Sequence, residues 1–333
     1  MRLLKVITCL VALVVSGLNA PAMKAVRVDE FGDRSVLKVT NIGRPEPGAG
    51  ELLVRVHAAS VNPVDWKMRQ HGDRMGMKTP FTPGFDVSGV VESIGPGVTK
   101  FKAGDAVFAM LDLRRGGAYA EYAIVKETEA AMKPAKTTHT EAAAVPLVAL
   151  TAWQALFDTA KLEKGQTVLI HGGSGGVGSM AIQLAKARGA RVIATASQDN
   201  LQFLSQLGVD QAIDYRTQKF EDLVKDVDVV LDTVGGETQQ RSLGVLKKGG
   251  VLVSIVGVST KKQADEMGVR IVGILVKPSS EQLGEIAKMI EAGTVRPFVS
   301  LVVPLNEVAK AHEQSETGHT RGKIVLRVLD DSP

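Results

Sequence analysis

Unbroken apolar runs alternate with amphipathic stretches along residues 147–294. The runs are nearly all Val, Ile and Leu, as in strands covered on both faces, and the stretches between them carry apolar residues at helical spacing. The predicted strands are 167–172, 190–196, 211–215, 227–234, 250–256 and 269–276, and the predicted helices are 176–188, 199–208, 218–225, 236–247 and 280–293. This alternation predicts an α/β fold with a doubly wound parallel sheet, in an order that suits dinucleotide binding.

A different pattern fills residues 23–146. Short apolar runs are separated by Gly and Pro clusters such as Pro47-Gly48, in which proline fixes φ and glycine accepts a positive φ. The predicted strands are 23–28, 51–59, 88–95, 105–111 and 119–125, with two more at 298–305 and 322–329. We therefore expect a β-rich domain at 23–146, completed by 295–333, and a separate α/β domain at 147–294.

Residues 1–22 have two interpretations, of which the first is an export leader. A basic start precedes the apolar run VITCLVALVVSGL, which is too short to span a bilayer comfortably, and Ala20-Pro21-Ala22 fits a small-x-small cleavage site. Cleavage after Ala22 would give an exported or periplasmic protein with no stable membrane span. Alternatively, Met23 is the true start and the protein is cytoplasmic.

Composition argues against several classes of function. The chain is 44% hydrophobic and 23% charged, which is typical of a soluble globular protein. A net charge of +4 is small for 333 residues, and the basic residues are interspersed with acids, so nucleic-acid binding is not expected. The single cysteine, Cys9, lies in the first ten residues, and the six histidines form no HxH or HxxxH pair. We therefore expect neither a disulfide nor a metal site.

The stretch TVLIHGGSGGVGS at 167–179 joins a predicted strand to a predicted helix. It holds the pattern G-x-G-x-x-G at Gly173, Gly175 and Gly178. In this context the first glycine allows a tight turn, the second lets a pyrophosphate approach the backbone, and the third lets the helix pack on the strand. Free amides at the helix N-terminus would then face the anion. The alternative is an ordinary glycine-rich turn without a ligand.

The next predicted strand ends at Ala196-Ser197 without an acidic residue. Proteins that bind NAD usually place Asp or Glu there to hold the ribose 2′-hydroxyl, and a carboxylate would repel a 2′-phosphate, so this end favours NADP(H). Ser197 would donate a hydrogen bond to the phosphate. In the alternative interpretation Ser197 is the N-cap of the helix that follows, with Asp199 in its first turn.

Several stretches together resemble the zinc-free, quinone-oxidoreductase-like branch of the medium-chain dehydrogenase/reductase superfamily, from Met23 to about Val328. They are ASVNPVDWKMR, PGFDVSGVVESIGPGV, GGAYAEYAIV, AAVPLVALTAWQAL, HGGSGGVGSMAIQLAK, LDTVGG and GKIVLRV. The resemblance implies a GroES-like first domain, a Rossmann second domain and an active cleft between them. Zinc-dependent relatives place a ligating Cys at the position of Asn62 and a His within Phe85-Asp86, so hydride transfer without zinc is implied here.

The same resemblance implies roles for individual residues. The implied coenzyme contacts are Ser174, Gly175, Gly176 and Val177 at the pyrophosphate; Ser197 and Tyr215 at the adenosine 2′-phosphate; Thr151, Thr233, Val234, Val256 and Gly257 around the nicotinamide and its ribose; and His319 and Arg321 in a closing C-terminal segment. The lysine that the family often carries just after the serine is absent here. Relatives are often dimers, so a homodimer is one expected state of assembly.

Asn62 is the candidate for a polar group that faces substrate and nicotinamide, and its alternative role is a turn residue before Pro63. Asp86 is expected to accept hydrogen bonds from backbone donors, and His171 to be buried and satisfied. The leading hypothesis is an NADPH-dependent oxidoreductase that transfers hydride to quinones or α,β-unsaturated carbonyls. No pair of side chains identifies a general acid. The alternative is a non-catalytic, NADPH-binding protein with a structural or regulatory role.

Overall fold

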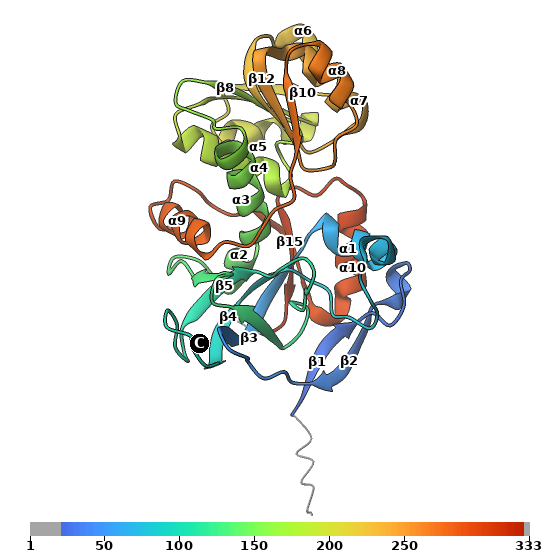
Figure 1. Cartoon of the computed structure of the whole chain (residues 1–333), viewed down its shortest axis with the longest axis vertical. Coiled ribbons are helices and arrows are strands. Elements are labelled where there is room, and N and C mark those ends of the chain that lie inside the picture. The colour runs from blue at the N-terminus through green and yellow to red at the C-terminus, as the bar shows by residue number, and fades with distance from the viewer. Residues whose placement is uncertain (1–20, 330–333) are drawn as a thin grey trace, which may run out of the picture.

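The structure of the chain is a computed structural model that describes residues 21–329. Its strands form a six-stranded, a seven-stranded and a two-stranded sheet. Figure 1 shows the six-stranded sheet with its helices at one end of the molecule and the other two sheets at the opposite end. Within the described residues, no helix has the length and apolar character that crossing a membrane requires. The predicted leader lies almost wholly outside the described residues.

The six-stranded sheet is parallel throughout. Its strands are β8 (Thr167–Ile170), β9 (Arg191–Ala196), β10 (Gln211–Asp214), β11 (Val227–Asp232), β12 (Leu246–Ser254) and β13 (Arg270–Gly273). The order across the sheet is β10-β9-β8-β11-β12-β13, so the chain works outward from β8 in one direction and then returns to β11 to continue in the other. This is the doubly wound order that binds dinucleotides, and the predicted fold class is confirmed.

Helices cover both faces of this sheet. They are α4 (Gly176–Ala187), α5 (Leu201–Gln206), α6 (Phe220–Leu223), α7 (Gly236–Ser242) and α8 (Lys261–Glu266). Ile170 belongs to the buried cluster on one face and Leu169 to the cluster on the other, which explains why the strands are apolar without alternation. One predicted boundary is wrong: the helix expected at 236–247 ends at Ser242, and Leu246 already begins β12.

The seven-stranded sheet combines strands from both ends of the chain. Its strands are β3 (Glu51–Val61), β4 (Asp86–Ile94), β5 (Ala106–Met110), β6 (Tyr122–Lys126), β7 (Ala130–Met132), β14 (Val299–Pro304) and β15 (Lys323–Arg327). β15 pairs antiparallel with β3, with Ile324 opposite Val61. The remaining strands, β1 (Ala22–Arg27) and β2 (Lys38–Gly43), form the two-stranded sheet. The domain boundaries at 146/147 and 294/295 stay predictions.

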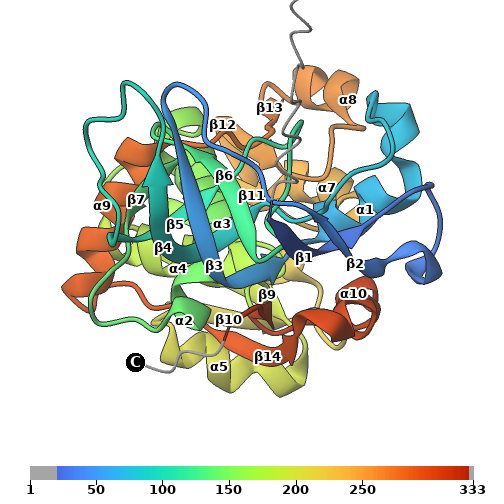
Figure 2. The ribbon, with the colours of Figure 1, turned by 90° about the horizontal axis from the view of Figure 1, so that it is seen from below.

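Five further helices pack around and between the sheets. They are α1 (Pro63–His71), α2 (His139–Ala143), α3 (Pro146–Trp153), α9 (Ser280–Glu291) and α10 (Val308–Glu316). α1 and α10 contact each other, and Figure 2 shows them on the opposite side of β3–β7 from α9. α3 packs against α4, α9 and β5, so it links the six-stranded and seven-stranded sheets. Its first turn, as described below, lies in the candidate site.

Candidate active site

Most of the predicted coenzyme contacts follow the carboxyl ends of parallel strands. The glycine loop follows β8, and Ser197, Tyr215, Thr233 and Val256 follow β9, β10, β11 and β12 in turn. Because these strands run in one direction, their carboxyl ends meet at a single edge of the sheet. β8 and β11 are neighbours at the point where the strand order reverses, and ligands of doubly wound sheets bind at this point.

The three motif glycines meet different surroundings. A Cβ on Gly178 would lie 2.2 Å from the carbonyl oxygen of Gly172, and one on Gly173 would lie 3.0 Å from the Cβ of Ala194. At Gly175 the φ angle is −75° and the nearest atom, again the Gly172 oxygen, would be 3.4 Å away. Packing thus requires glycine at 178 and leaves little room for a side chain at 173, whereas neither packing nor backbone conformation requires glycine at 175. A ligand that approaches the backbone closely would account for the glycine at 175, the second of the motif.

The N-terminus of α4 offers backbone donors beside Gly175. The helix begins at Gly176, so the amides of Gly176, Val177 and Gly178 in its first turn have no acceptor within the helix. No acidic side chain occupies this turn, and the helix dipole places partial positive charge there. The loop residues therefore fit a pyrophosphate group.

The segment after β9 binds the side chain of Arg321, which comes from a distant part of the chain. Arg321 donates to the Oδ1 atom of Asn200 at 2.6 Å and to the backbone oxygen of Asp199 at 2.9 Å. Asn200 in turn donates to Ser197 Oγ at 2.9 Å. Ser197 holds the N-cap position of the short helix 198–200 without a side-chain capping bond. The side chain of Tyr215 is exposed beside this segment, and its backbone amide bonds to the end of β9.

The loops after β11 and β12 touch each other. A Cβ on Gly235 would lie 3.1 Å from Val256 Cγ2, and the hydroxyl of Thr233 donates to the backbone oxygen of His171 at 2.8 Å. Val234 and Val256 are 55% and 42% exposed, an apolar surface at the same sheet edge. The structure thus brings these predicted nicotinamide contacts together, with Gly257 next in the chain at a φ of +102°.

The structure does not bring His319 together with the other predicted coenzyme contacts. Its side chain is exposed, and its backbone amide donates to Thr317 Oγ1 at 3.2 Å. Within residues 21–329, no hydrogen bond or ion pair connects the His319 ring to another predicted contact. His171, by contrast, is buried as expected: its ring bonds to Thr195 and Ser242, and burial lowers its pKa to about 4.

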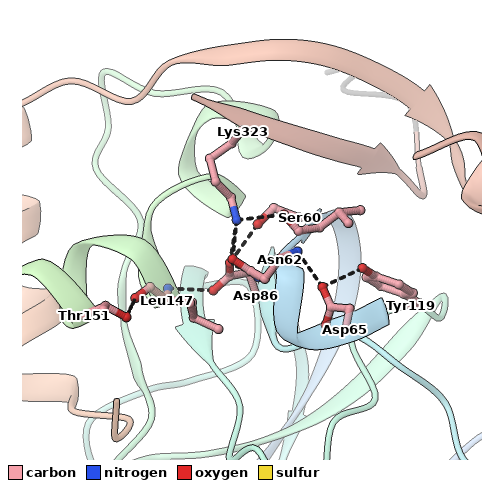
Figure 3. Close-up of polar contacts among 9 residues, drawn as sticks. Ser60, Asn62, Asp65, Asp86, Tyr119, Leu147, Thr151 and Lys323 are labelled. Atoms are coloured by element: carbon pink, nitrogen blue, oxygen red, sulfur yellow. Dashed lines mark hydrogen bonds and ion pairs between the residues drawn. The ribbon is translucent and has the colours of Figure 1, made fainter. Parts of the chain in front are cut away.

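A buried polar cluster lies around Asn62 (Figure 3). Asp86 is its centre: one carboxylate oxygen accepts from Ser60 Oγ at 2.7 Å and from Asn62 Nδ2 at 2.8 Å, and the other accepts from the amide of Leu147 at 2.7 Å. Leu147 is in the first turn of α3, where a carboxylate is favoured by the helix dipole. The expectation that Asp86 satisfies a backbone donor is confirmed.

Lys323 completes this cluster, and sequence reasoning gave it no role. Its side chain is 5% exposed. The ammonium donates to Asn62 Oδ1 and, at 3.0 Å, to the backbone oxygen of Val61, and it lies 3.5 Å from the Asp86 carboxylate. Burial lowers the pKa of Lys323, an effect that the Asp86 charge opposes. The only hint in the sequence is a lysine that opens the apolar strand KIVLR.

The start of β15 also contacts the glycine loop. The amide of Gly322 donates to the backbone oxygen of Ser174 at 2.8 Å, and Gly322 forms a β-bridge with Gly175. A Cβ on Gly176 would lie 3.0 Å from Lys323 Cδ. The cluster around Asn62 is therefore adjacent to the loop that fits a pyrophosphate.

Asn62 and Thr151 have defined partners within the protein. Asn62 is fully buried before Pro63, the first residue of α1, and its backbone amide donates to the Asp65 carboxylate at 2.6 Å. Its amide oxygen and one Nδ2 hydrogen are bonded to Lys323 and Asp86, which leaves one hydrogen as a donor. Thr151 is 4% exposed and donates to the Leu147 oxygen at 2.6 Å. The coenzyme and substrate roles of both residues stay predictions.

Asp65 extends the cluster to Tyr119. The tyrosine hydroxyl donates to the Asp65 carboxylate at 2.9 Å, and the second carboxylate oxygen has no partner among the described residues. Burial raises the pKa of Asp65 to about 7, and burial together with Asp65 raises the pKa of Tyr119 well above its usual value. In residues 21–329, no three His, Cys, Asp or Glu side chains are grouped as metal ligands would be.

Comparisons with known proteins agree on the family. Residues 48–135 match the alcohol dehydrogenase GroES-like domain, and residues 207–326 match the family described as zinc-binding dehydrogenase. The chain is 37% identical to the mitochondrial NAD(P)H oxidoreductase RTN4IP1 of Mus musculus, over 93% of this chain and 90% of that protein. It is also 37% identical to the chloroplastic NADPH-dependent alkenal/one oxidoreductase of Arabidopsis thaliana, over 91% and 79% of the two chains.

A solved structure is similar to this chain in both sequence and fold. The quinone oxidoreductase from Coxiella burnetii superimposes with a TM-score of 0.86 at 36% identity, over 92% of this chain and all of that one. The chain therefore belongs to the medium-chain dehydrogenase/reductase superfamily, in its quinone-oxidoreductase-like branch. It is an oxidoreductase that depends on a nicotinamide coenzyme.

Proposed function

We propose that this oxidoreductase transfers hydride from NADPH to quinones or α,β-unsaturated carbonyls, without a zinc ion. The observation that carries the proposal is Gly175, the motif glycine that neither packing nor backbone angle explains, at a helix N-terminus without acidic residues. A coenzyme pyrophosphate accounts for both features. The relatives named as a quinone oxidoreductase and an alkenal/one oxidoreductase support the choice of substrates.

NADPH is favoured over NADH by the charges around Ser197. No acid ends β9, and the Arg321 guanidinium bonds to the segment that directly follows the serine. This guanidinium supplies positive charge where the lysine common in the family is absent. Arg216, next to Tyr215, adds a second cation near the same strand ends. Positive charge beside a strand end that carries no carboxylate suits a 2′-phosphate, although Asp199 lies two residues beyond Ser197.

The residues of the cluster would orient the substrate carbonyl. When bound, the coenzyme supplies the hydride, and the chain supplies position and electrostatics. Lys323 and Asp86 fix the rotation of the Asn62 amide, so its remaining N–H has one direction in which to donate. The nearby ammonium favours negative charge that develops on a carbonyl oxygen. Asn62 and Phe85 offer no ligand of the kind zinc prefers, and three hydrogen bonds already engage the Asp86 carboxylate.

A substrate panel tests the function. Oxidation of NADPH is followed by absorbance with a simple quinone, an alkenal, an alkenone and a saturated aldehyde, and NADH serves as the control coenzyme. We expect turnover with the three conjugated acceptors, and unchanged rates after dialysis against a chelator. Tight NADPH binding without turnover on any acceptor would favour the non-catalytic alternative. No affinity for either reduced coenzyme would refute the proposal.

Arg321→Met tests the coenzyme preference. We expect the ratio of NADH to NADPH dissociation constants to fall by about tenfold, because one charge-assisted contact with the phosphate is worth about 1.5 kcal/mol or more. Arg188→Met is the matched control, since Arg188 also lies over an aromatic ring, that of Phe157, as Arg321 lies over Phe203. A ratio unchanged by Arg321→Met would assign the preference to other residues.

The homodimer and the exported leader stay predictions.

A further inference from the structure

Gln239 is a buried glutamine on an otherwise polar helix. α7 carries the sequence GETQQRS, and Gln239 is 1% exposed whereas Gln240, the next residue, is exposed. The Nε2 group of Gln239 lies 2.8 Å from Asp232 Oδ2, 2.8 Å from the Gly257 backbone oxygen and 3.1 Å from Ser254 Oγ. One amide nitrogen thus joins the end of β11 to the end of β12 and to the loop that follows it.

The other end of the same side chain holds the far part of that loop. Gln239 Oε1 accepts from the backbone amide of Ser259 at 2.9 Å, from the Ser259 hydroxyl at 3.0 Å and from the Thr260 hydroxyl at 3.3 Å. Residues 257–260 are therefore held by both ends of one amide group. Because the group is buried, each of these bonds is costly to leave unmade.

Asp232 extends the arrangement to the loop after β11. Its Oδ1 atom accepts from the amides of Val234 at 3.0 Å and Gly235 at 2.8 Å, and its Oδ2 atom also accepts from Ser254 Oγ at 2.9 Å. The buried pair Asp232–Gln239 is thus bonded to both loops that carry Val234, Val256 and Gly257. The bonds of this pair do not include Ser197, Tyr215 or Arg321, at the other end of the predicted coenzyme site.

We infer that Gln239 is a positioning residue for the nicotinamide half of the coenzyme, an inference that rests on the proposed function. It sets the relative position of the loops after β11 and β12, and with them the exposed Val234 and Val256 side chains. The adenosine half binds residues that Gln239 does not hold. A change at Gln239 should therefore affect the two halves of the coenzyme unequally, and a merely structural role would not produce that difference.

Two substitutions perturb the pair, and a third serves as control. Gln239→Glu removes the N–H donors and places a second carboxylate against Asp232, where two like charges repel. Gln239→Leu leaves Asp232 and the Gly257 oxygen without this donor. Gln240→Glu makes the same chemical change one position along α7, on the exposed side. Dissociation constants are measured for NADPH and for adenosine 2′,5′-bisphosphate, which contains only the adenosine half.

Both Gln239 variants are expected to bind NADPH at least about tenfold more weakly, a ratio equivalent to about 1.4 kcal/mol, while the bisphosphate dissociation constant stays unchanged. Their kcat should fall as well, and Gln240→Glu should behave as wild type. If both Gln239 variants fail to fold, Ser259→Ala removes one outer bond and should weaken NADPH binding by a smaller ratio, again without affecting the bisphosphate.

The outcomes separate this inference from the proposed function. Equal weakening for both ligands, or a lower melting temperature with both affinities intact, would overturn the positioning role. So would unchanged NADPH affinity in the Gln239 variants, or in Ser259→Ala where those variants do not fold. Wild-type protein that binds neither NADPH nor the bisphosphate would instead refute the proposed function itself.

Discussion

Replacement of Lys323 by methionine tests the buried cluster around Asn62. Methionine is unbranched and similar in length, so it removes the charge with little change in packing. The change leaves Asn62 Oδ1 without its donor and Asp86 without its nearby cation, whereas the Val61 oxygen keeps its place in the β3–β15 ladder opposite Ile324. One unsatisfied buried acceptor costs about 1–3 kcal/mol, and breaking a buried ion pair costs about 3–5 kcal/mol in measured cases. Because Asp86 keeps three hydrogen bonds, we expect a loss of about 3–5 kcal/mol of unfolding free energy.

Urea unfolding followed by tryptophan fluorescence measures this loss. Trp66 reports on the site because it lies in α1, the helix that Asn62 precedes. Lys261→Met is the matched control: Lys261 pairs with Asp265 at 3.1 Å, one turn away on a helix, with both side chains more than 60% exposed. Exposed pairs of this kind contribute about 0.3–0.5 kcal/mol, so the same substitution there should shift the midpoint only slightly.

A result of a different kind would refute the reasoning. If Lys323→Met costs no more than Lys261→Met, the ammonium contributes nothing beyond a solvent-exposed charge, and its role in fixing Asn62 falls with it. The double variant Lys323→Met, Asp86→Asn gives a second measurement. It should be more stable than the sum of the single changes predicts, because the neutral amide no longer needs a cation. Strict additivity would show that the two side chains do not interact.

Two other predictions follow from the site. Burial raises the pKa of Asp65 from 3.8 to about 7, so its contribution to stability is fully present below the lower value and is lost as the pH rises through about 7. The melting temperature of Asp65→Asn minus that of wild type should therefore rise between about pH 4 and about pH 7, and a constant difference would contradict this. Gly175→Ala should weaken NADPH binding and leave the melting temperature unchanged, whereas Gly178→Ala should cost about 1–3 kcal/mol or more, because its Cβ would meet the Gly172 oxygen at 2.2 Å. Equal melting temperatures for the two alanine variants would show that the loop tolerates both.

The six-stranded sheet could be predicted because its strands are buried on both faces. β9 and β11 are apolar runs between amphipathic helices, a pattern that local sequence displays in full. β2 could not be predicted in the same way. Its residues KVTNIG are mostly exposed, so no alternation of apolar and polar positions marks it as a strand. β2 is a strand because it pairs with β1, and its own residue pattern does not reveal that partner.

Some residues of the candidate site could likewise be predicted from the sequence, and others could not. The glycine loop could be located because its glycines lie close together in the sequence, at a spacing that marks a strand-to-helix turn. Lys323 and Gln239 could not, because lysine and glutamine are mostly exposed residue types and nothing adjacent in the sequence indicates their burial. Only the pairing of β15 with β3 brings Lys323 to Asn62, and only the packing of α7 brings Gln239 to Asp232.

The short path from Ser174 through Gly322 to Lys323 has a mechanical consequence. Two adjacent residues contact the two large sheets. Gly322 bonds to the glycine loop of the six-stranded sheet, and Lys323 bonds to β3 of the seven-stranded sheet. A displacement of that loop would strain the bond between Gly322 and Ser174 or move Lys323 relative to the Asn62 amide. If coenzyme and substrate bind as proposed, binding of coenzyme at the glycine loop would therefore alter the position of Asn62 through only two residues, Gly322 and Lys323.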